Sequence, residues 1–198
     1  MSDLMSRRRA LMGAQNGGST PILPAEYQQV EWVGVRNTTT TPTAYISVGQ
    51  VINSGDTLNV ELKPFNIIGQ YDSPIGYYTY DSGIHSWELY YTNNGNKFEL
   101  YHSNPGSTLV SYSISDWDSA IISFAANSGL TLLTYRTNSY AFSGKIKSVV
   151  VTNSSNNVTH NYIPCYRKAD TAIGFYDLIT DTFLTKSGTG TLLKGADV

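Results

Sequence analysis

Thr-Leu-Asn-Val-Glu-Leu-Lys, residues 57–63, is the stretch that decides the fold class. Leu58, Val60 and Leu62 alternate with polar residues, so an extended chain places the three apolar side chains on one face and the polar ones on the other. An amphipathic helix would need apolar residues at helical spacing instead. The stretch therefore predicts a strand with one face on a core and the other toward solvent.

Runs of the same kind recur from Tyr27 onward, with turn residues between them. Further strands are expected around Phe98 and Leu100 and in residues 44–52, 84–92, 109–114, 120–125, 130–135, 145–152 and 157–163. The expected separators include residues 93–96, 103–106, 127–129 and 153–156. About a dozen strands exceed the needs of an immunoglobulin-like domain and favour two larger sheets. We therefore expect an all-β, two-sheet antiparallel jelly-roll sandwich.

The composition favours one β-rich domain and restricts its partners. Of 198 residues, 15 are Tyr and only 14% are charged, while Ala, Leu, Lys and Glu are too sparse for several long helices. The net charge is −2 and the only basic run is Arg7-Arg8-Arg9, so nucleic acid is not expected as a partner. No segment approaches the roughly 20 apolar residues of a membrane span, and no apolar run of signal-peptide length follows the arginines. We therefore expect neither a membrane partner nor export by a signal peptide.

Residues 1–21 are expected to form an arm and linker in front of a domain over residues 22–198. Ser2 and Asp3 can cap a helix, and Gly13 would end it. Such a helix carries an apolar stripe about 120° wide, with basic residues in and beside it. These candidate anchoring residues are Leu4, Met5, Arg7, Arg8, Arg9, Leu11 and Met12. A helix of about eleven residues is marginal by itself in water, so we expect it to dock on a partner or on copies of itself. The alternative is a frayed leader without function.

The arrangement of acidic and nucleophilic residues argues against catalysis. Glycoside hydrolysis needs two carboxylates facing each other across the scissile bond. The five glutamates are isolated: Glu26, Glu31, Glu61, Glu88 and Glu99. Asp116 and Asp118 flank Trp117, which is interpreted as turn chemistry around a buried aromatic. The three histidines and the lone Cys165, expected to be a buried thiol, lack the spacing of a zinc site or a catalytic pair. We therefore expect no enzyme, no cofactor and no bound metal.

Aromatic residues are concentrated in the middle of the chain, where they are candidates for glycan contacts. In residues 87–91, alternation puts Trp87, Leu89 and Tyr91 on one face and Glu88 with Tyr90 on the other. The first face is expected in the core. The glycan-contact candidates are therefore Tyr78, Tyr80 and Tyr90, and the alternative is that these tyrosines simply line strands.

The C-terminal third resembles a known family. Residues 144–149 (GKIKSV), 161–168 (NYIPCYRK), 173–178 (IGFYDL) and 182–190 (TFLTKSGTG) form one cassette. This cassette resembles the closing part of the LamG/concanavalin A-like jelly-roll modules of phage and prophage virion proteins and of gut-bacterial surface proteins. Residues 23–32 and 44–49 are similar to the opening strands of the family, so the resemblance covers residues 23–198 and is strongest at the two ends.

The cassette residues themselves have expected structural roles. Arg167 and Lys168 follow a strand end that contains proline, and Asp177 can accept hydrogen bonds from loop backbone. Gly188 and Gly190 permit a tight closing turn. None of these residues is expected to form a binding site.

The resemblance implies a non-enzymatic virion protein, either an appendage, a fibre or a decoration subunit. Residues 1–12 are similar to the starts of phage tail and appendage proteins, which implies that the arm anchors the chain to other virion proteins. A homo-oligomer, with trimers common among such appendages, and a host surface glycan are the further partners implied. The alternatives are a bacterial surface lectin-like carbohydrate-binding module and, disfavoured by the isolated carboxylates, a glycosidase.

Overall fold

The computed structural model describes residues 22–66, 72–78, 86–92, 97–102, 107–111, 117–136 and 139–198. Within these ranges the regular structure is entirely β, as expected from the alternating runs. The arm of residues 1–21 lies outside the described residues, so its helix and its anchoring role stay predictions. Tyr80, His85 and Asp116 also lie outside the described residues, as do the turns expected at residues 93–96 and 103–106, so these expectations stay predictions as well.

The described strands are numbered in their order along the chain. They are β1 (Tyr27–Gln29), β2 (Val33–Val35), β3 (Ile46–Ile52), β4 (Thr57–Pro64), β5 (Asp72–Tyr77), β6 (Trp87–Thr92), β7 (Lys97–His102), β8 (Ser107–Ser111), β9 (Asp118–Phe124), β10 (Ser128–Leu132), β11 (Thr134–Arg136), β12 (Ser139–Ala141), β13 (Gly144–Thr152), β14 (Val158–Arg167), β15 (Ile173–Asp177), β16 (Thr182–Thr185) and β17 (Leu192–Lys194).

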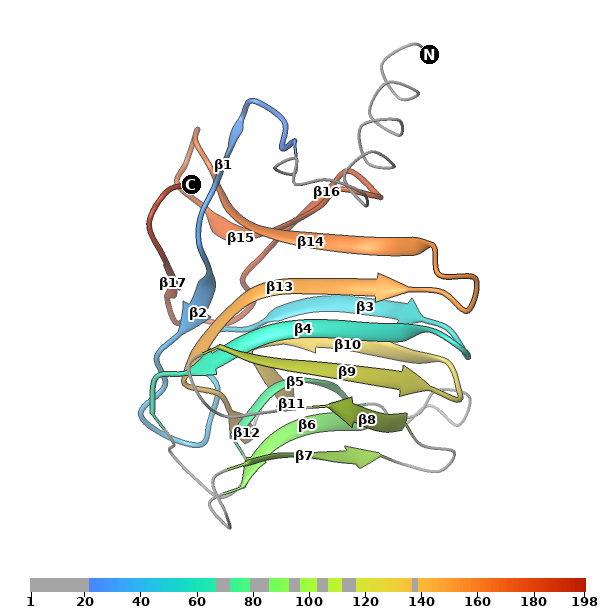
Figure 1. Cartoon of the computed structure of the whole chain (residues 1–198). Coiled ribbons are helices and arrows are strands. Elements are labelled where there is room, and N and C mark those ends of the chain that lie inside the picture. The colour runs from blue at the N-terminus through green and yellow to red at the C-terminus, as the bar shows by residue number, and fades with distance from the viewer. Residues whose placement is uncertain are drawn as a thin grey trace.

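Two antiparallel sheets form the molecule. The larger has ten strands, seven of them in the order β16-β15-β14-β13-β4-β9-β8, while β1, β2 and β17 pair along its side. The smaller has five strands in the order β3-β10-β5-β6-β7, and β11 with β12 makes a separate hairpin. Figure 1 shows the larger sheet in front of the smaller one.

One core lies between the two sheets. Leu58, Val60 and Leu62 of β4 are almost completely buried, which confirms the strand predicted from their alternation. Trp87 of the smaller sheet meets Phe124 of the larger sheet edge to face, with ring centroids 5.0 Å apart. The Trp87 indole donates a hydrogen bond to the Gly129 carbonyl at 3.0 Å, so its one polar atom is satisfied inside the core.

The alternating runs located nine of the seventeen described strands, and several boundaries differ from those expected. Ser128 and Gly129, expected in a separator, lie inside β10, and the strand needs a glycine at position 129 because the ring of Tyr77 packs where a β-carbon would stand. The strand expected over residues 130–135 is broken at Leu133, whose φ of 71° ends β10 before β11 begins. By contrast, residues 153–156 form the expected turn between β13 and β14, with Asn156 at a φ of 60°.

The C-terminal cassette ties the start of the domain to its end. Lys168 donates from its ammonium to the Ala25 carbonyl at 2.8 Å and from its backbone to the Glu26 carbonyl at 2.9 Å. The expected closing turn is confirmed: Gly188 has a φ of 89°, and the backbone of Gly190 donates to the Thr43 carbonyl at 2.7 Å. These contacts hold the last segments of the chain against its first strands.

Asp177 is the buried acceptor that fixes the turn after β15, as the cassette predicts. Its carboxylate accepts from the backbone of Asn161 and Ile179 at 3.0 Å each and from the Thr180 hydroxyl at 2.8 Å. The His160 ring lies 2.7 Å from the same carboxylate. Burial by itself would raise the pKa of Asp177, but these hydrogen bonds together lower that pKa below its ordinary value.

Replacing Asp177 should make the free energy of unfolding less dependent on pH in the acidic range. Because the folded pKa of Asp177 is lowered, its charged form adds stability that is present above the ordinary carboxyl pKa and is lost as pH falls through the folded pKa. Asp177→Asn should therefore lower the free energy of unfolding by about 2 kcal/mol at pH 7, and the difference from wild type should shrink below about pH 4. Urea denaturation at pH 7, 5 and 3 measures this. Asp170→Asn, at an exposed carboxylate, is the control and should have a much smaller effect. An Asp177→Asn deficit of equal size at pH 7 and pH 3 would contradict the role of the charge.

Candidate binding surface

The outer face of the larger sheet carries a cluster of aromatic and basic side chains where β13 meets β2 and β4. In this register Lys145 of β13 lies opposite Gly34 of β2 on one side and Lys63 of β4 on the other. The next residue, Ile146, is completely buried in the core. Because side chains alternate along a strand, Lys145 points away from the core.

Three aromatic rings surround the Lys145 ammonium. It lies 4.8 Å from the ring centroid of Trp117, 4.9 Å from Trp32 and 5.8 Å from Phe65. The guanidinium of Arg36 lies 4.7 Å from the centroid of Phe65 on β4's extension. We refer to Trp32, Arg36, Phe65, Trp117 and Lys145 as the Lys145 cluster. Trp117, expected to be a buried turn aromatic, is half-buried on this outer face, because it precedes β9 on the side opposite the core.

Two glycines make room for the cluster. A β-carbon at Gly34 would lie 2.4 Å from the Gly144 carbonyl oxygen and 3.0 Å from the β-carbon of Lys145. A β-carbon at Gly195 would lie 2.7 Å from the indole nitrogen of Trp32. Trp32 also meets Phe65 edge to face, with centroids 5.6 Å apart. The absence of a side chain at Gly34 and Gly195 therefore lets Lys145 and Trp32 pack directly against the backbone.

A β-bulge directs two neighbouring side chains to one carboxylate. The register of β13 on β4 shifts between Ile146 and Ser148. Lys147 and Ser148 consequently both reach Glu61, the ammonium at 3.7 Å and the hydroxyl at 3.1 Å. The Glu61 carboxylate on this face is thus already paired.

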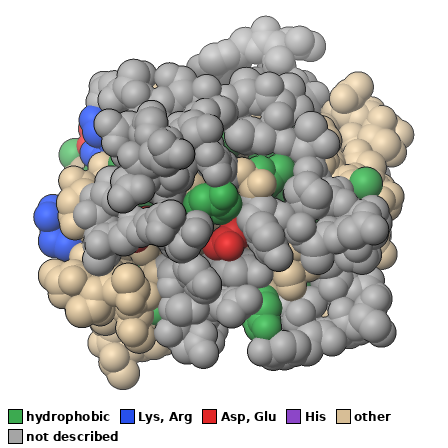
Figure 2. Space-filling view, turned by 90° about the horizontal axis from the view of Figure 1, so that it is seen from below, with side chains coloured by type: hydrophobic (Ala, Val, Ile, Leu, Met, Phe, Trp, Pro, Cys, Tyr) green, Lys and Arg blue, Asp and Glu red, His purple; other side chains and the backbone are tan. Residues whose placement is uncertain are grey.

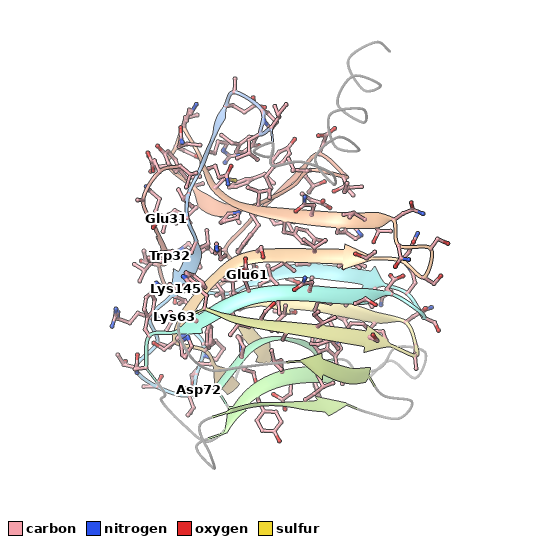
Figure 3. All side chains as sticks on the ribbon, viewed as in Figure 1. Glu31, Trp32, Glu61, Lys63, Asp72 and Lys145 are labelled. Carbon is pink, nitrogen blue, oxygen red and sulfur yellow. The ribbon has the colours of Figure 1, made fainter. Side chains whose placement is uncertain are left out.

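Lys145 and Arg36 differ from Lys147 in their partners. Among the described residues, neither cation forms an ion pair, and the contacts of both are with aromatic rings. In Figure 3 Trp32, Lys63 and Lys145 lie along one edge of the molecule, with Glu31 above them. In the view from below, Lys and Arg side chains are visible at that same left-hand edge (Figure 2). Positive charge and aromatic surface therefore coincide there.

Of the tyrosines proposed for glycan contacts, Tyr90 lies in β6 of the smaller sheet and Tyr78 directly follows β5, while Tyr80 lies outside the described residues. Tyr78 and Tyr90 are half-buried and each has an interaction partner. Beside Tyr90, Glu88 is buried and accepts a short hydrogen bond from the Ser73 hydroxyl. Figure 2 shows acidic and hydrophobic side chains at the centre of the face seen from below, between residues that are not described. Tyr90 therefore lies on the other sheet from Lys145.

The residues considered for catalysis occupy structural positions where they are described. Cys165 is completely buried, as expected, and burial raises the pKa of its thiol to about 12. His160 binds Asp177 and stacks on Tyr162, with centroids 5.6 Å apart. Within the described ranges, no three His, Cys, Asp or Glu side chains are grouped to hold a metal ion. A helix with the length and apolarity of a membrane span is also missing from those ranges.

Comparison with known proteins yields little. No family model matches the chain, and no curated protein matches it. Among solved structures, WceF of Pantoea stewartii, described as a glycan biofilm modifying enzyme with a bacteriophage tailspike-like parallel β-helix fold, is 14% identical. The match covers 90% of this chain and 27% of that one, with a TM-score of 0.18. Similarity at that level says nothing about fold or function, and the chain spans only about a quarter of that protein's length.

Two substitutions distinguish the contribution of the cluster's side chains to stability from that of the backbone beneath them. Lys145→Met should change the free energy of unfolding by less than about 1 kcal/mol, because it removes only partly exposed cation–π contacts. Gly34→Ala should cost about 1–3 kcal/mol, because its β-carbon collides with the Gly144 backbone. Urea denaturation at pH 7 measures both values. A larger loss for Lys145→Met than for Gly34→Ala would mean that Lys145 holds the sheet together.

Proposed function

We propose that the chain is a non-enzymatic phage virion subunit that binds a host surface saccharide through the Lys145 cluster and attaches to the particle through its arm. The observation that carries the saccharide part is that half-exposed rings lie together with two cations, Arg36 and Lys145, that form no ion pair with any residue the structure describes. Flat rings offer an apolar platform for the face of a sugar, and the neighbouring cations offer hydrogen-bond donors. Binding a saccharide in this way requires only these contact groups and no catalytic acid or nucleophile.

The fold assigned to the domain in this proposal is a LamG/concanavalin A-like jelly roll. The path of the chain supports it, since β3 and β5 belong to the smaller sheet while β4 between them belongs to the larger. The chain changes sheet again between β7 and β8 and between β9 and β10. Such repeated crossing is typical of two-sheet Greek-key sandwiches. The closing contacts of Asp177, Gly188 and Lys168 agree with the cassette on which the resemblance rests.

The saccharide part is tested by removing the rings. Trp32→Ala and Trp117→Ala in the full chain should each weaken binding on a glycan array at least about tenfold, or about 1.4 kcal/mol, because each variant removes one of the two indole rings on which the sugar face would pack. Phe183→Ala is the matched control, since Phe183 also lies beside a cation, Arg167, at 5.4 Å but outside the cluster. Unchanged binding by both tryptophan variants would overturn the assignment to this surface and direct attention to Tyr90.

The virion part is tested in particles. The chain should be found in purified virions in a fixed copy number, and deletion of residues 1–20 should prevent its incorporation. Leu4→Asp combined with Leu11→Asp should do the same, because both residues lie in the expected apolar stripe. Ser6→Asp, on the opposite side of that helix, is the control and should be incorporated normally. Mass spectrometry of particles measures this, and normal incorporation of the deletion variant would show that the arm is no anchor.

A further inference from the structure

We infer that the saccharide bound by the Lys145 cluster is acidic, a pyranose carrying a carboxylate such as a uronic or sialic acid. This inference rests on the proposed saccharide-binding function and adds the chemical class of the ligand. The indoles of Trp32 and Trp117 would form the walls of the site, and Lys145 with Arg36 would pair the carboxylate.

The distribution of charge is the first reason. The chain has 13 basic residues and a net charge of −2, and three of the basic residues lie in the arm, which leaves ten for the domain (13 − 3). Four of those ten are on this one face, namely Arg36, Lys63, Lys145 and Lys147, and of these Lys147 is paired with Glu61 and Lys63 has a partner of its own. An acidic chain that gathers positive charge on one face offers local attraction to an anion despite its overall charge.

The second reason is that Glu61, the carboxylate on this face, is paired with a cation other than Lys145. Glu61 is occupied by Lys147 and Ser148, so it does not neutralise Lys145. The rings around Lys145 remove part of its water and hold its ammonium in place, which strengthens its attraction for an anion that arrives from solvent. Arg36, held over Phe65, offers a planar fork of donors that matches the two oxygens of a carboxylate.

The third reason is the spacing of the cations, which favours an acidic saccharide over a nucleic acid. Binding to a nucleic-acid backbone uses a track of basic residues that neutralises several phosphates in succession. Here Arg36 and Lys145, which have no ion-pair partner in the described part of the chain, are gathered around one ring, that of Phe65, at 4.7 Å and 5.8 Å. This spacing suits a single anionic group, and the indoles beside it suit a sugar face.

Matched acidic and neutral probes test the inference. Trigalacturonate is compared with its fully methyl-esterified form, and sialyllactose with lactose, by isothermal titration calorimetry on the full chain. At least one acid should bind about tenfold or more tightly than its neutral counterpart, and its affinity should fall with added salt. Lys145→Met and Arg36→Met should each reduce that preference at least about fivefold. Lys168→Met, at an exposed lysine bound to Ala25, is the control and should keep it.

The outcomes distinguish this inference from the function on which it rests. Equal binding of acid and neutral partner, or equal loss of both in Lys145→Met, would overturn the acidic ligand and leave a neutral saccharide site standing. Inorganic sulfate or a single-stranded oligonucleotide that displaces the acidic sugar at equal concentration would also overturn it. Failure of all four probes, together with tryptophan variants that behave as wild type on the array, would overturn the proposed saccharide binding itself.

Discussion

The register of β13 is the constraint on which the rest of the larger sheet depends. This strand pairs with β4 along its whole length on one edge, and with β2 and then β14 on the other. The bulge between Ile146 and Ser148 shifts the alternation by one residue, so that Ile146, Val149 and Val151 all face the core. Strict alternation from Ile146 would bury Ser148 instead, and a slip of one residue would turn Lys145 inward, which costs far more than the bulge.

The same register produces the outer surface. Once Ile146 is fixed in the core, Lys145 must stand outside it, between a glycine on β2 and Lys63 on β4. The bulge then brings Lys147 and Ser148 to Glu61, so the contacts of Lys145 are with the aromatic rings. Packing on one face of the sheet therefore decides which charges on the other face are paired and which are available to a ligand.

Local patterns predicted the parts of the fold that depend on neighbours in sequence. The alternation in residues 57–63, the asparagine turn at residues 153–156 and the acceptor role of Asp177 are all confirmed. The errors arose where a distant residue decides the conformation. Gly129 resembles a turn residue until the ring of Tyr77 is seen to occupy the space of its side chain, and Leu133 resembles a strand residue although its φ is positive.

The Lys145 cluster was beyond such prediction, because its members are far apart in the sequence and each is ordinary by itself. The odd-numbered positions of β4 do indicate that Glu61 and Lys63 share an outward face, and Phe65, directly after the strand, continues the same alternation. Joining them to Trp32, Trp117 and Lys145 needs the pairing of β2 with β13 and of β13 and β9 with β4, including a bulge that no local pattern predicts. Because the cluster stands on the sheet without filling its core, its side chains can determine a ligand while the glycines and the buried alternation beneath them determine the fold.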